Sequence, residues 1–242
     1  MSDGTSHDRD EELLLARISA AGGRAHLGRR RATYRAAPNG ATVRAGRGAA
    51  IRLLRRVVAE GACRLLRAGG RTGANTRARL DFYEHGMTAA VGGRIHVIRY
   101  DTTMVCLRRV LSPRGFTHAH VLVDVDGERI VLRCGDFGHP EVWGAEIRRA
   151  VTEAQVPRAL AALAGGERLT FGPVWITRDE IGSRGTSLRW PQVQQIDMVN
   201  GSVAIRVAGR WQVLGSVAAG SPNGFVFHAL AEHLAGAERD DD

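Results

Sequence analysis

Residues 168–201, RLTFGPVWITRDEIGSRGTSLRWPQVQQIDMVNG, decide how this chain is organised, because an earlier stretch follows the same plan. From residue 79 the chain reads RLDFYEHGMTAAVGGRIHVIRYDTTMVCL, with the same Arg-Leu-x-Phe opening, a glycine turn, and an arginine followed by an aromatic residue. Self-similarity of this kind is the signature of a repeated structural unit. The matching residues are Arg79, Leu80, Phe82, Arg99 and Tyr100 in the first stretch and Arg168, Leu169, Phe171, Arg189 and Trp190 in the second. The sequence therefore predicts two similar units in tandem.

The first unit has the pattern of short strands followed by one helix. Strands are expected at residues 80–83, 87–91, 95–100, 103–107, 117–125 and 129–133. The pairs Gly92-Gly93 and Asp126-Gly127 suit tight hairpin turns. After Pro140 the period changes to that of a helix, with a kink or break expected at Pro157 and a stop at residues 165–166.

The second unit repeats this plan over a shorter length. Strands are expected at residues 168–171, 174–178, 186–190, 193–199, 202–207 and 210–214. Ser221 and Pro222 suit the start of a closing amphipathic helix, as an N-cap residue followed by proline at the first helical position. Each unit is thus expected to have six or seven strands capped by one C-terminal helix, in an α+β fold. Trp143 and Trp190 are expected in the cores of the two units.

The N-terminal region has a different composition from these units. Residues 8–21 predict a short amphipathic helix, residues 24–48 a largely irregular connector with a short strand at 32–35, and residues 69–77 a linker. Residues 49–68 predict a second amphipathic helix with five arginines on one side and apolar residues on the other. Three interpretations of this helix stay open: it packs on the neighbouring domain, it lies in a membrane surface, or it binds nucleic acid or an acidic protein.

Positive charge is concentrated in the N-terminal part of the chain. Residues 24–79 contain fifteen arginines and one glutamate, a net charge of +14, whereas residues 80–242 contain seventeen arginines and nineteen acids, a net charge of −2. This asymmetry predicts an anionic partner for the basic segment. The residues expected to contact that partner are Arg29, Arg30, Arg31, Arg52, Arg55, Arg56, Arg64 and Arg67.

Several classes of function are excluded or disfavoured by composition. All 34 basic residues are arginine, so mechanisms that need a lysine ammonium, such as a Walker-type phosphate loop, a kinase lysine or a Schiff base, are excluded. The three cysteines are far apart, which argues against a disulfide framework or a zinc site. No apolar run long enough to span a membrane is present, and the acidic N-terminus is unlike a secretory signal. A cytoplasmic protein is expected, with peripheral attachment at the inner membrane face as one option.

Catalytic and metal-binding patterns are nearly absent from the sequence. No nucleophile elbow, catalytic cysteine signature or glycine-rich phosphate loop occurs, so no enzyme activity and no cofactor are expected. The one arrangement that suggests a metal is His118 and His120 on one face of a predicted strand, with Asp124 further along that face. It supports a metal-dependent activity as the weakest of the functional alternatives.

Two resemblances bear on the fold. The phrase GPVWITRDEIGSRGTSLRWPQVQQI resembles the core of bacterial pleckstrin-homology-like (PH-like) domains, and a small curled antiparallel barrel closed by one helix resembles the PH-like and GRAM-like superfold. Residues 79–236, with segments such as YEHGMTAAVGGRIHVIRYD and SPNGFVF, are similar to a domain family of unknown function from actinobacteria. The resemblance implies two tandem β-barrel or sandwich units and offers no catalytic residues to transfer.

Together these observations predict four regions. A basic helical N-terminal region covers residues 1–78, PH-like units cover residues 79–166 and 167–237, and residues 238–242 form an acidic disordered tail. The expected function is that of a non-enzymatic binding or scaffolding protein that docks at an anionic membrane surface or on a protein partner. The alternative is non-specific nucleic-acid binding through residues 24–79.

Overall fold

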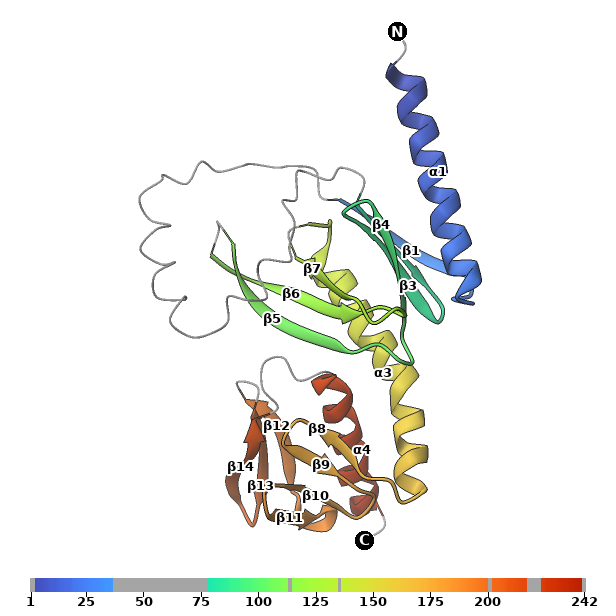
Figure 1. Cartoon of the computed structure of the whole chain (residues 1–242). Coiled ribbons are helices and arrows are strands. Elements are labelled where there is room, and N and C mark those ends of the chain that lie inside the picture. The colour runs from blue at the N-terminus through green and yellow to red at the C-terminus, as the bar shows by residue number, and fades with distance from the viewer. Residues whose placement is uncertain are drawn as a thin grey trace.

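The computed structural model describes residues 3–36, 78–112, 115–134, 136–199, 202–216 and 223–240 of the chain. The helix predicted at residues 49–68 and the linker predicted at 69–77 lie outside the described residues. Within them, one helix precedes two successive sets of antiparallel sheets, and each set is followed by a helix (Figure 1). None of the helices in this described part is long and apolar enough to cross a membrane.

The first set contains seven strands in two sheets. Helix α1 (Asp3–Arg24) comes before it and helix α3 (Pro140–Ala164) after it. A four-stranded sheet has the order β1-β2-β3-β4, and a three-stranded sheet has the order β5-β6-β7. The strands are β1 (Arg30–Arg35), β2 (Arg79–Tyr83), β3 (Gly86–Val91), β4 (Arg94–Arg99), β5 (Val105–Ser112), β6 (Gly115–Val123) and β7 (Arg129–Arg133).

The second set repeats this order of elements with shorter strands. Its four-stranded sheet has the order β11-β10-β9-β8, its three-stranded sheet has the order β12-β13-β14, and helix α4 (Gly224–Asp240) follows. The strands are β8 (Leu169–Phe171), β9 (Val174–Ile176), β10 (Glu180–Ser183), β11 (Thr186–Arg189), β12 (Gln195–Val199), β13 (Ser202–Val207) and β14 (Arg210–Ser216), with the 3-10 turn η3 (Trp190–Gln192) between β11 and β12. Seven strands capped by one helix agree with the sequence-based expectation for each unit.

The expectation of a closed barrel is not met in the described residues. Each set consists of two separate sheets, and no ladder runs continuously around either set. In the first set a single bridge, between Ala36 and Phe137, joins the end of β1 to the chain after β7. One paired residue is too little to close a sheet on itself, so the edges stay distinct.

The two similar sequence stretches occupy corresponding places in their sheets at their C-terminal ends but not at their N-terminal ends. Arg99 ends β4 and Arg189 ends β11, the corresponding edge strands of the two sheets, and the aromatic residues Tyr100 and Trp190 come directly after them. The Arg79 stretch, however, forms β2, the second strand of its sheet, whereas the Arg168 stretch leads into β8, the first. The first strand of the earlier sheet is β1, in the stretch predicted as a connector with a strand at 32–35. The sequence pattern missed β10, whose four residues include only Ile181 as a large apolar side chain.

Helix α1 covers one face of the first sheet. It contains the helix predicted at residues 8–21 and packs against β3 and β4, with Ile18 fully buried. The chain then turns so that the side chain of Leu27 lies against Gly86, where a β-carbon would sit 2.7 Å from a Leu27 methyl group. Because the core covers the other face, all five residues of β2 are buried.

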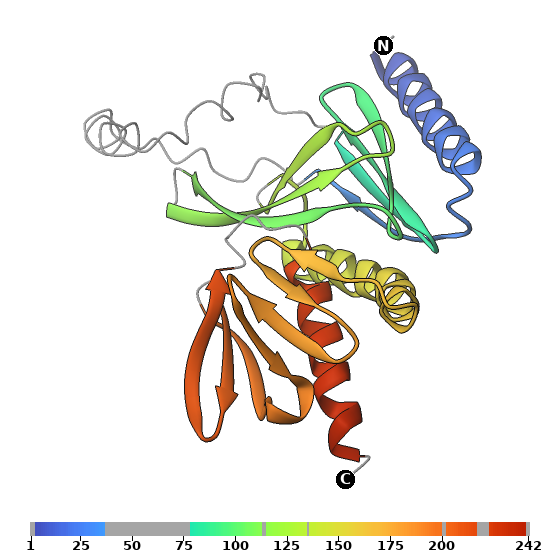
Figure 2. The same cartoon turned by 60° about the horizontal axis from the view of Figure 1, so that its bottom comes forward.

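Helix α3 joins the two sets. Figure 2 shows it between the two sets of sheets with α4 beside it, and one continuous cluster of buried side chains includes residues of both sets. Trp143 and Trp190 are both in this core, as predicted. Of the kink or break predicted at Pro157, the break is wrong, because the helix runs through this residue. Packing of Val151 before this proline and Leu163 after it holds the helical path despite the missing N–H group.

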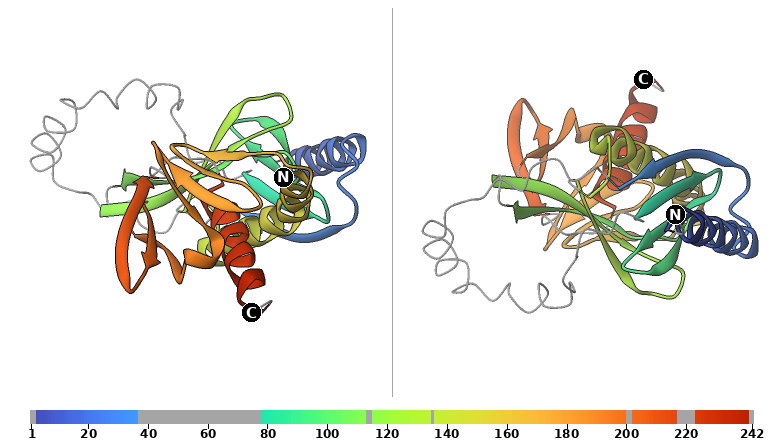
Figure 3. Two further views of the ribbon diagram at one scale, coloured as in Figure 1. Left: turned by 90° about the horizontal axis from the view of Figure 1, so that it is seen from below. Right: turned by 90° about the horizontal axis from the view of Figure 1, so that it is seen from above.

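The helix ends agree with the sequence only in part. Helix α3 stops at residues 165–166 as predicted, with Gly166 at φ 85°. Helix α4 begins at Gly224, and the predicted cap at Ser221 and Pro222 lies outside the described residues. It continues through residues 238–240, which the sequence had assigned to a disordered tail. Figure 3 shows α1 and β14 on opposite sides of the molecule.

Candidate functional site

One face of the β5–β7 sheet carries arginines around a small apolar centre. Arg108 in β5 lies opposite Ala119 in β6, and Ala119 lies opposite Arg133 in β7, so these side chains share a face. By the same register Val121 lies opposite Val131, and Arg129 opposite Val123. Val131 is 43% exposed, although it belongs to a strand. This arginine face is defined here by Arg108, Arg129, Arg133, Val121 and Val131.

The three arginines of the arginine face form no ion pair within the described part of the chain. Arg133 does act on the carboxylate of Asp136: burial raises the pKa of Asp136, and the charge of Arg133 lowers it. The Nε atom of Arg108 is buried and has no hydrogen-bond partner. Ala119, although it is on this open face, is fully buried, as expected if the aliphatic stems of the flanking Arg108 and Arg133 cover it.

Such an arrangement favours an anionic partner. Three like charges on one small sheet repel one another, and a bound anion removes that repulsion while it gains charge-assisted hydrogen bonds. Cys106 is on the same face, and burial raises the pKa of its thiol, while Arg108 and Arg129 act in the opposite direction. The sequence contained these arginines as scattered positions, and only the strand register brings them together.

The arginines predicted from the sequence are distributed differently. The backbone N–H of Arg29 donates to Glu84, and a guanidinium nitrogen of Arg30 lies 3.4 Å from Asp81. Arg31 lines a cavity of about 200 Å³ together with Glu146 and Glu153. Arg52, Arg55, Arg56, Arg64 and Arg67 lie outside the described residues. Of Arg29, Arg30 and Arg31, only Arg30 has its guanidinium in an ion pair with a carboxylate in the described part of the chain.

A buried ion pair between Arg79, the last residue of the basic segment, and Asp81 lies next to Arg30. The guanidinium of Arg79 donates to both oxygens of Asp81, over 2.7 and 2.9 Å, and the hydroxyl of Thr33 donates to Asp81 over 2.7 Å. Asp81 is fully buried and Arg79 is 9% exposed. Arg79 therefore has a structural role that joins β1 to β2, and it is not available to an external partner.

The predicted metal ligands do not come together. His118 is exposed, whereas His120 is buried against the edge of Trp143, with ring centroids 5.1 Å apart. Both ring nitrogens of His120 lack a hydrogen-bond partner, and burial lowers its pKa to about 4. Asp124 pairs instead with His96. The set of His118, His120 and Asp124 is thus not a site.

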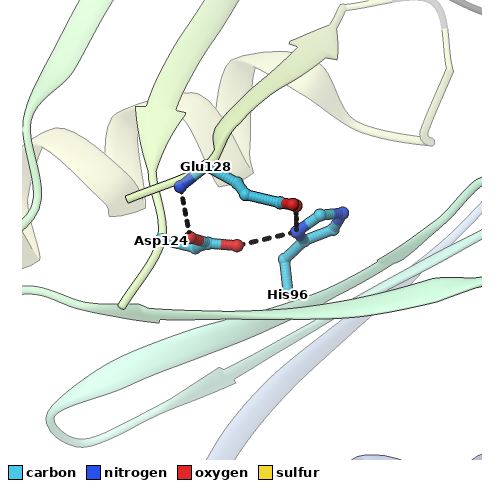
Figure 4. A group of neighbouring side chains, drawn as sticks. All are labelled: His96, Asp124 and Glu128. Carbon is cyan, nitrogen blue, oxygen red and sulfur yellow. Dashed lines mark hydrogen bonds and ion pairs between the residues drawn. The ribbon is translucent and has the colours of Figure 1, made fainter. Parts of the chain in front are cut away.

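A different cluster, which sequence reasoning missed, joins the two sheets of the first set. Figure 4 shows His96, Asp124 and Glu128, whose ligand atoms lie within 4.8 Å of one another. One Asp124 oxygen lies 2.8 Å from Nδ1 of His96, and the other accepts the N–H groups of Asp126 and Glu128. Glu128 also pairs with Arg94 at 3.0 Å.

These contacts make the cluster a clasp between β4 and the β6–β7 turn. The N–H of Val125 in that turn donates to the carbonyl of Val97 in β4 at 2.9 Å, which adds a backbone link beside the side chains. A cation could use the three ligand atoms only after Arg94 had left Glu128. The Asp126-Gly127 turn was the only signal of this contact in the sequence, because the partner His96 is far away along the chain.

Comparison with known proteins identifies a family and no relative of known function. The model of a family described as a family of unknown function (DUF6585) matches residues 74–236, more than half of the chain. No curated protein and no solved structure matches the chain. The arginine face lies wholly inside the matched residues.

Proposed function

The chain belongs to the DUF6585 family of unknown function, and from its surfaces we propose that it is a non-enzymatic binding module that docks on an anionic membrane surface through the arginine face. The observation that carries this proposal is the group of three arginines around the exposed Val131; these arginines form no ion pair with any residue that the structure describes. Arginine guanidinium groups recognise phosphate groups well, and the valines between them can contact the acyl boundary. We place this docking in the cytoplasm, at the inner face of the membrane.

The arginine face alone would bind weakly. A basic residue near an anionic leaflet contributes about 1 kcal/mol, so three of them give an affinity weaker than about 1 mM. Residues 37–77 add nine arginines and one glutamate, a net charge of +8 on the same chain. The N–H of Ala36 donates to the carbonyl of Ala78 at 2.8 Å, so the two described residues that flank this segment lie side by side. Contacts by both parts on one membrane would reinforce each other.

The order of elements supports the PH-like part of the proposal. Four strands, three strands and a helix, repeated twice, is the order expected for two PH-like units in tandem. We propose that each set is such a unit. This likeness concerns the fold, and the argument for membrane docking rests on the arginine face.

A membrane fits the arginine face better than the other anionic partners considered. Nucleic acid and acidic proteins would bind the three arginines equally well. A phosphate backbone or an acidic side chain, however, has no apolar group that would contact Val121 and Val131. Both alternatives remain outcomes of the experiment.

The proposal is tested by sedimentation of the full chain with lipid vesicles. We expect binding to phosphatidylglycerol-containing vesicles, little binding to phosphatidylcholine vesicles, and weakening with salt because exposed charges are screened. The variant with Arg108, Arg129 and Arg133 each replaced by Gln should bind about tenfold more weakly or worse. The control replaces three exposed arginines of the second set, Arg178, Arg189 and Arg206, and removes the same charge.

The control separates a specific face from net charge. Equal losses in the two triple variants would show that overall charge, and not the arginine face, attracts the membrane. Binding to both vesicle types alike would contradict the proposal. Gel shifts with duplex DNA that are weakened by the first triple variant, in the absence of vesicle binding, would favour the nucleic-acid alternative.

A further inference from the structure

Strand β14 forms an open edge of the second set. It is the outer strand of the β12-β13-β14 sheet, and Arg210, Trp211, Gln212 and Val213 are all exposed. Trp211 is 49% and Val213 71% exposed, the highest value among the large apolar side chains of the described residues. Figure 1 shows β14 at the margin of the molecule, and no strand other than β13 is paired with it in the described part.

The free edge has few of the features that normally prevent strand pairing. Exposed edge strands are blocked in many proteins by proline, a charged side chain or a bulge. Residues 210–213 contain no proline, their one charged side chain is Arg210 at the start of the strand, and the irregularity in the β13–β14 register comes only at Leu214, between Val213 and Gly215. Within the described part of the chain nothing is paired with the outer side of residues 210–213, so their outward backbone N–H and C=O groups are available to another strand.

We propose that β14 pairs in antiparallel fashion with β14 of a second copy of this chain, which joins the two three-stranded sheets into one. If the twofold axis passes through Gln212, Trp211 of one copy lies opposite Val213 of the other, and the reverse. An aromatic side chain opposite a β-branched one is a favourable cross-strand pair. The two Arg210 residues are then separated by four positions along the strands, about 14 Å. This distance exceeds the Debye screening length at physiological salt, so their repulsion is largely screened.

The same strand suits a membrane less well. Asp197 in β12 lies opposite Ala204, and Ala204 lies opposite Val213. Arg206 lies opposite Trp211, so the face of the exposed apolar residues carries one charge of each sign. This face therefore has no net positive charge that would attract an anionic leaflet. Hydrocarbon also offers no hydrogen bonds to an open strand edge, whereas a second β14 satisfies its backbone groups. These two facts favour a second copy of the chain as the occupant.

The expected association is weak and depends on concentration. A contact limited to one short strand from each copy buries less than about 1,200 Å², the size typical of transient complexes. Sedimentation equilibrium of the full chain should therefore show the weight-average mass rising from monomer toward dimer as protein concentration increases. A mass that stays monomeric up to the highest soluble concentration would overturn the proposal.

Two lysine substitutions distinguish edge pairing from other contacts. Val213→Lys places a charge opposite Trp211 of the second copy and should raise the dissociation constant about tenfold or more. Val199→Lys alters another valine on the same face, 49% exposed, but on β12 at the far side of the sheet, and should leave the dissociation constant unchanged. Because both valines are exposed, the thermal midpoints of the monomers should stay close to that of the native chain.

The outcomes are separable from those of the membrane experiment. If both lysine variants abolish dimers, the two copies stack face to face and edge pairing is wrong. If neither does, the dimer uses another surface and the proposal is also wrong. Vesicle binding by the arginine face depends on neither valine, so either experiment can fail while the other succeeds.

Discussion

At the scale of single residues, His120 makes stability depend on pH. Its imidazole is buried between β6 and α3 without hydrogen-bond partners, and burial lowers its pKa from 6.5 to about 4, with smaller contributions from Arg148 and His118. Folding therefore favours the neutral ring. The contribution of the neutral ring to the free energy of unfolding is fully present above about pH 6.5. It is lost as the pH falls toward 4, by up to roughly 3 kcal/mol.

Replacement of His120 should reduce this acid sensitivity. We expect His120→Leu to lose less unfolding free energy between pH 7 and pH 4.5 than the native chain, as measured by urea denaturation at each pH. His233→Leu removes an exposed imidazole that is not among the groups acting on the pKa of His120, and this control should keep the native pH dependence. Identical pH profiles for the native chain and His120→Leu would show that this ring does not control acid stability.

Gly144 is the second residue whose role follows from His120. A β-carbon at this position of α3 would lie 2.8 Å from Cε1 of His120, whereas one at Gly236 in α4 would meet nothing within 4 Å. Gly144→Ala should therefore destabilise the protein by about 1–3 kcal/mol, despite the higher helix propensity of alanine. Gly236→Ala should stabilise it by up to about 1 kcal/mol. If denaturant titrations show that Gly144→Ala and Gly236→Ala raise the free energy of unfolding by the same amount, Gly144 is not packed against His120 as described.

At the scale of elements, Asn223 ties the start of α4 to the first set. Its side-chain oxygen accepts the N–H of Val105 over 2.7 Å, and its side-chain nitrogen donates to Thr103 and Gln155 over 3.1 and 2.8 Å. The residue also adopts φ 56°, a conformation that asparagine tolerates better than alanine. Gln155 in turn donates to the carbonyls of Tyr100 and Thr103, so α3, α4 and the β4–β5 loop share one network.

Loss of this network should cost more than loss of an exposed hydrogen bond. Asn223→Ala leaves partly buried polar groups unpaired and should lower the unfolding free energy by roughly 2–3 kcal/mol. Gln192→Ala removes one exposed bond, from the N–H of Arg189 to the Gln192 side chain, and should cost less than about 1 kcal/mol. Thermal or urea unfolding of both variants gives the comparison. A cost for Asn223→Ala no larger than that of the control would show that the network does not hold the sets together.

The elements themselves could largely be predicted from the sequence, because their periods and turns are local. Strands β2, β3, β4 and β7 and helix α3 lie close to their predicted positions. Contacts between distant elements had no local signal. The bonds of Asn223 to Val105, and the pairing of β1 with β2 across residues 37–77, depend on how the sheets pack. The missed strand β10 shows the same limit, since pairing with β9 and β11 makes it a strand despite its weak propensity.

At the scale of the whole molecule, the two sets share one core. The buried cluster is continuous from the first sheet through Trp143 and Val151 of α3 to Phe227 and Leu230 of α4. Unfolding of one set would expose apolar surface of the other, so we expect one cooperative thermal transition with equal calorimetric and van't Hoff enthalpies. Two resolved transitions in scanning calorimetry would mean that the sets are stable independently, as a simple tandem repeat would be.

The candidate site was predictable from the sequence only in its charge. Arginine excess predicts an anionic partner, and the residues predicted to contact it are close together in the sequence. In the described part of the chain the guanidinium of Arg30 pairs with Asp81, and five of the eight predicted residues lie outside that part. Arg108, Arg129 and Arg133 are separated by up to 25 residues and were not singled out as a group. Alternation along three paired strands places them on one face, and pairing register is not readable from composition.

Membrane docking by the arginine face is tested most directly by an environment-sensitive dye at its centre. Val131→Cys would carry the dye in a chain whose native cysteines are replaced by serine, and Val199→Cys on β12 would carry it in the control. With phosphatidylglycerol vesicles, emission from position 131 should shift to the blue and return at high salt, while emission from position 199 should not change. Vesicle binding without a shift at position 131, or with a shift at position 199 instead, would contradict docking through the arginine face.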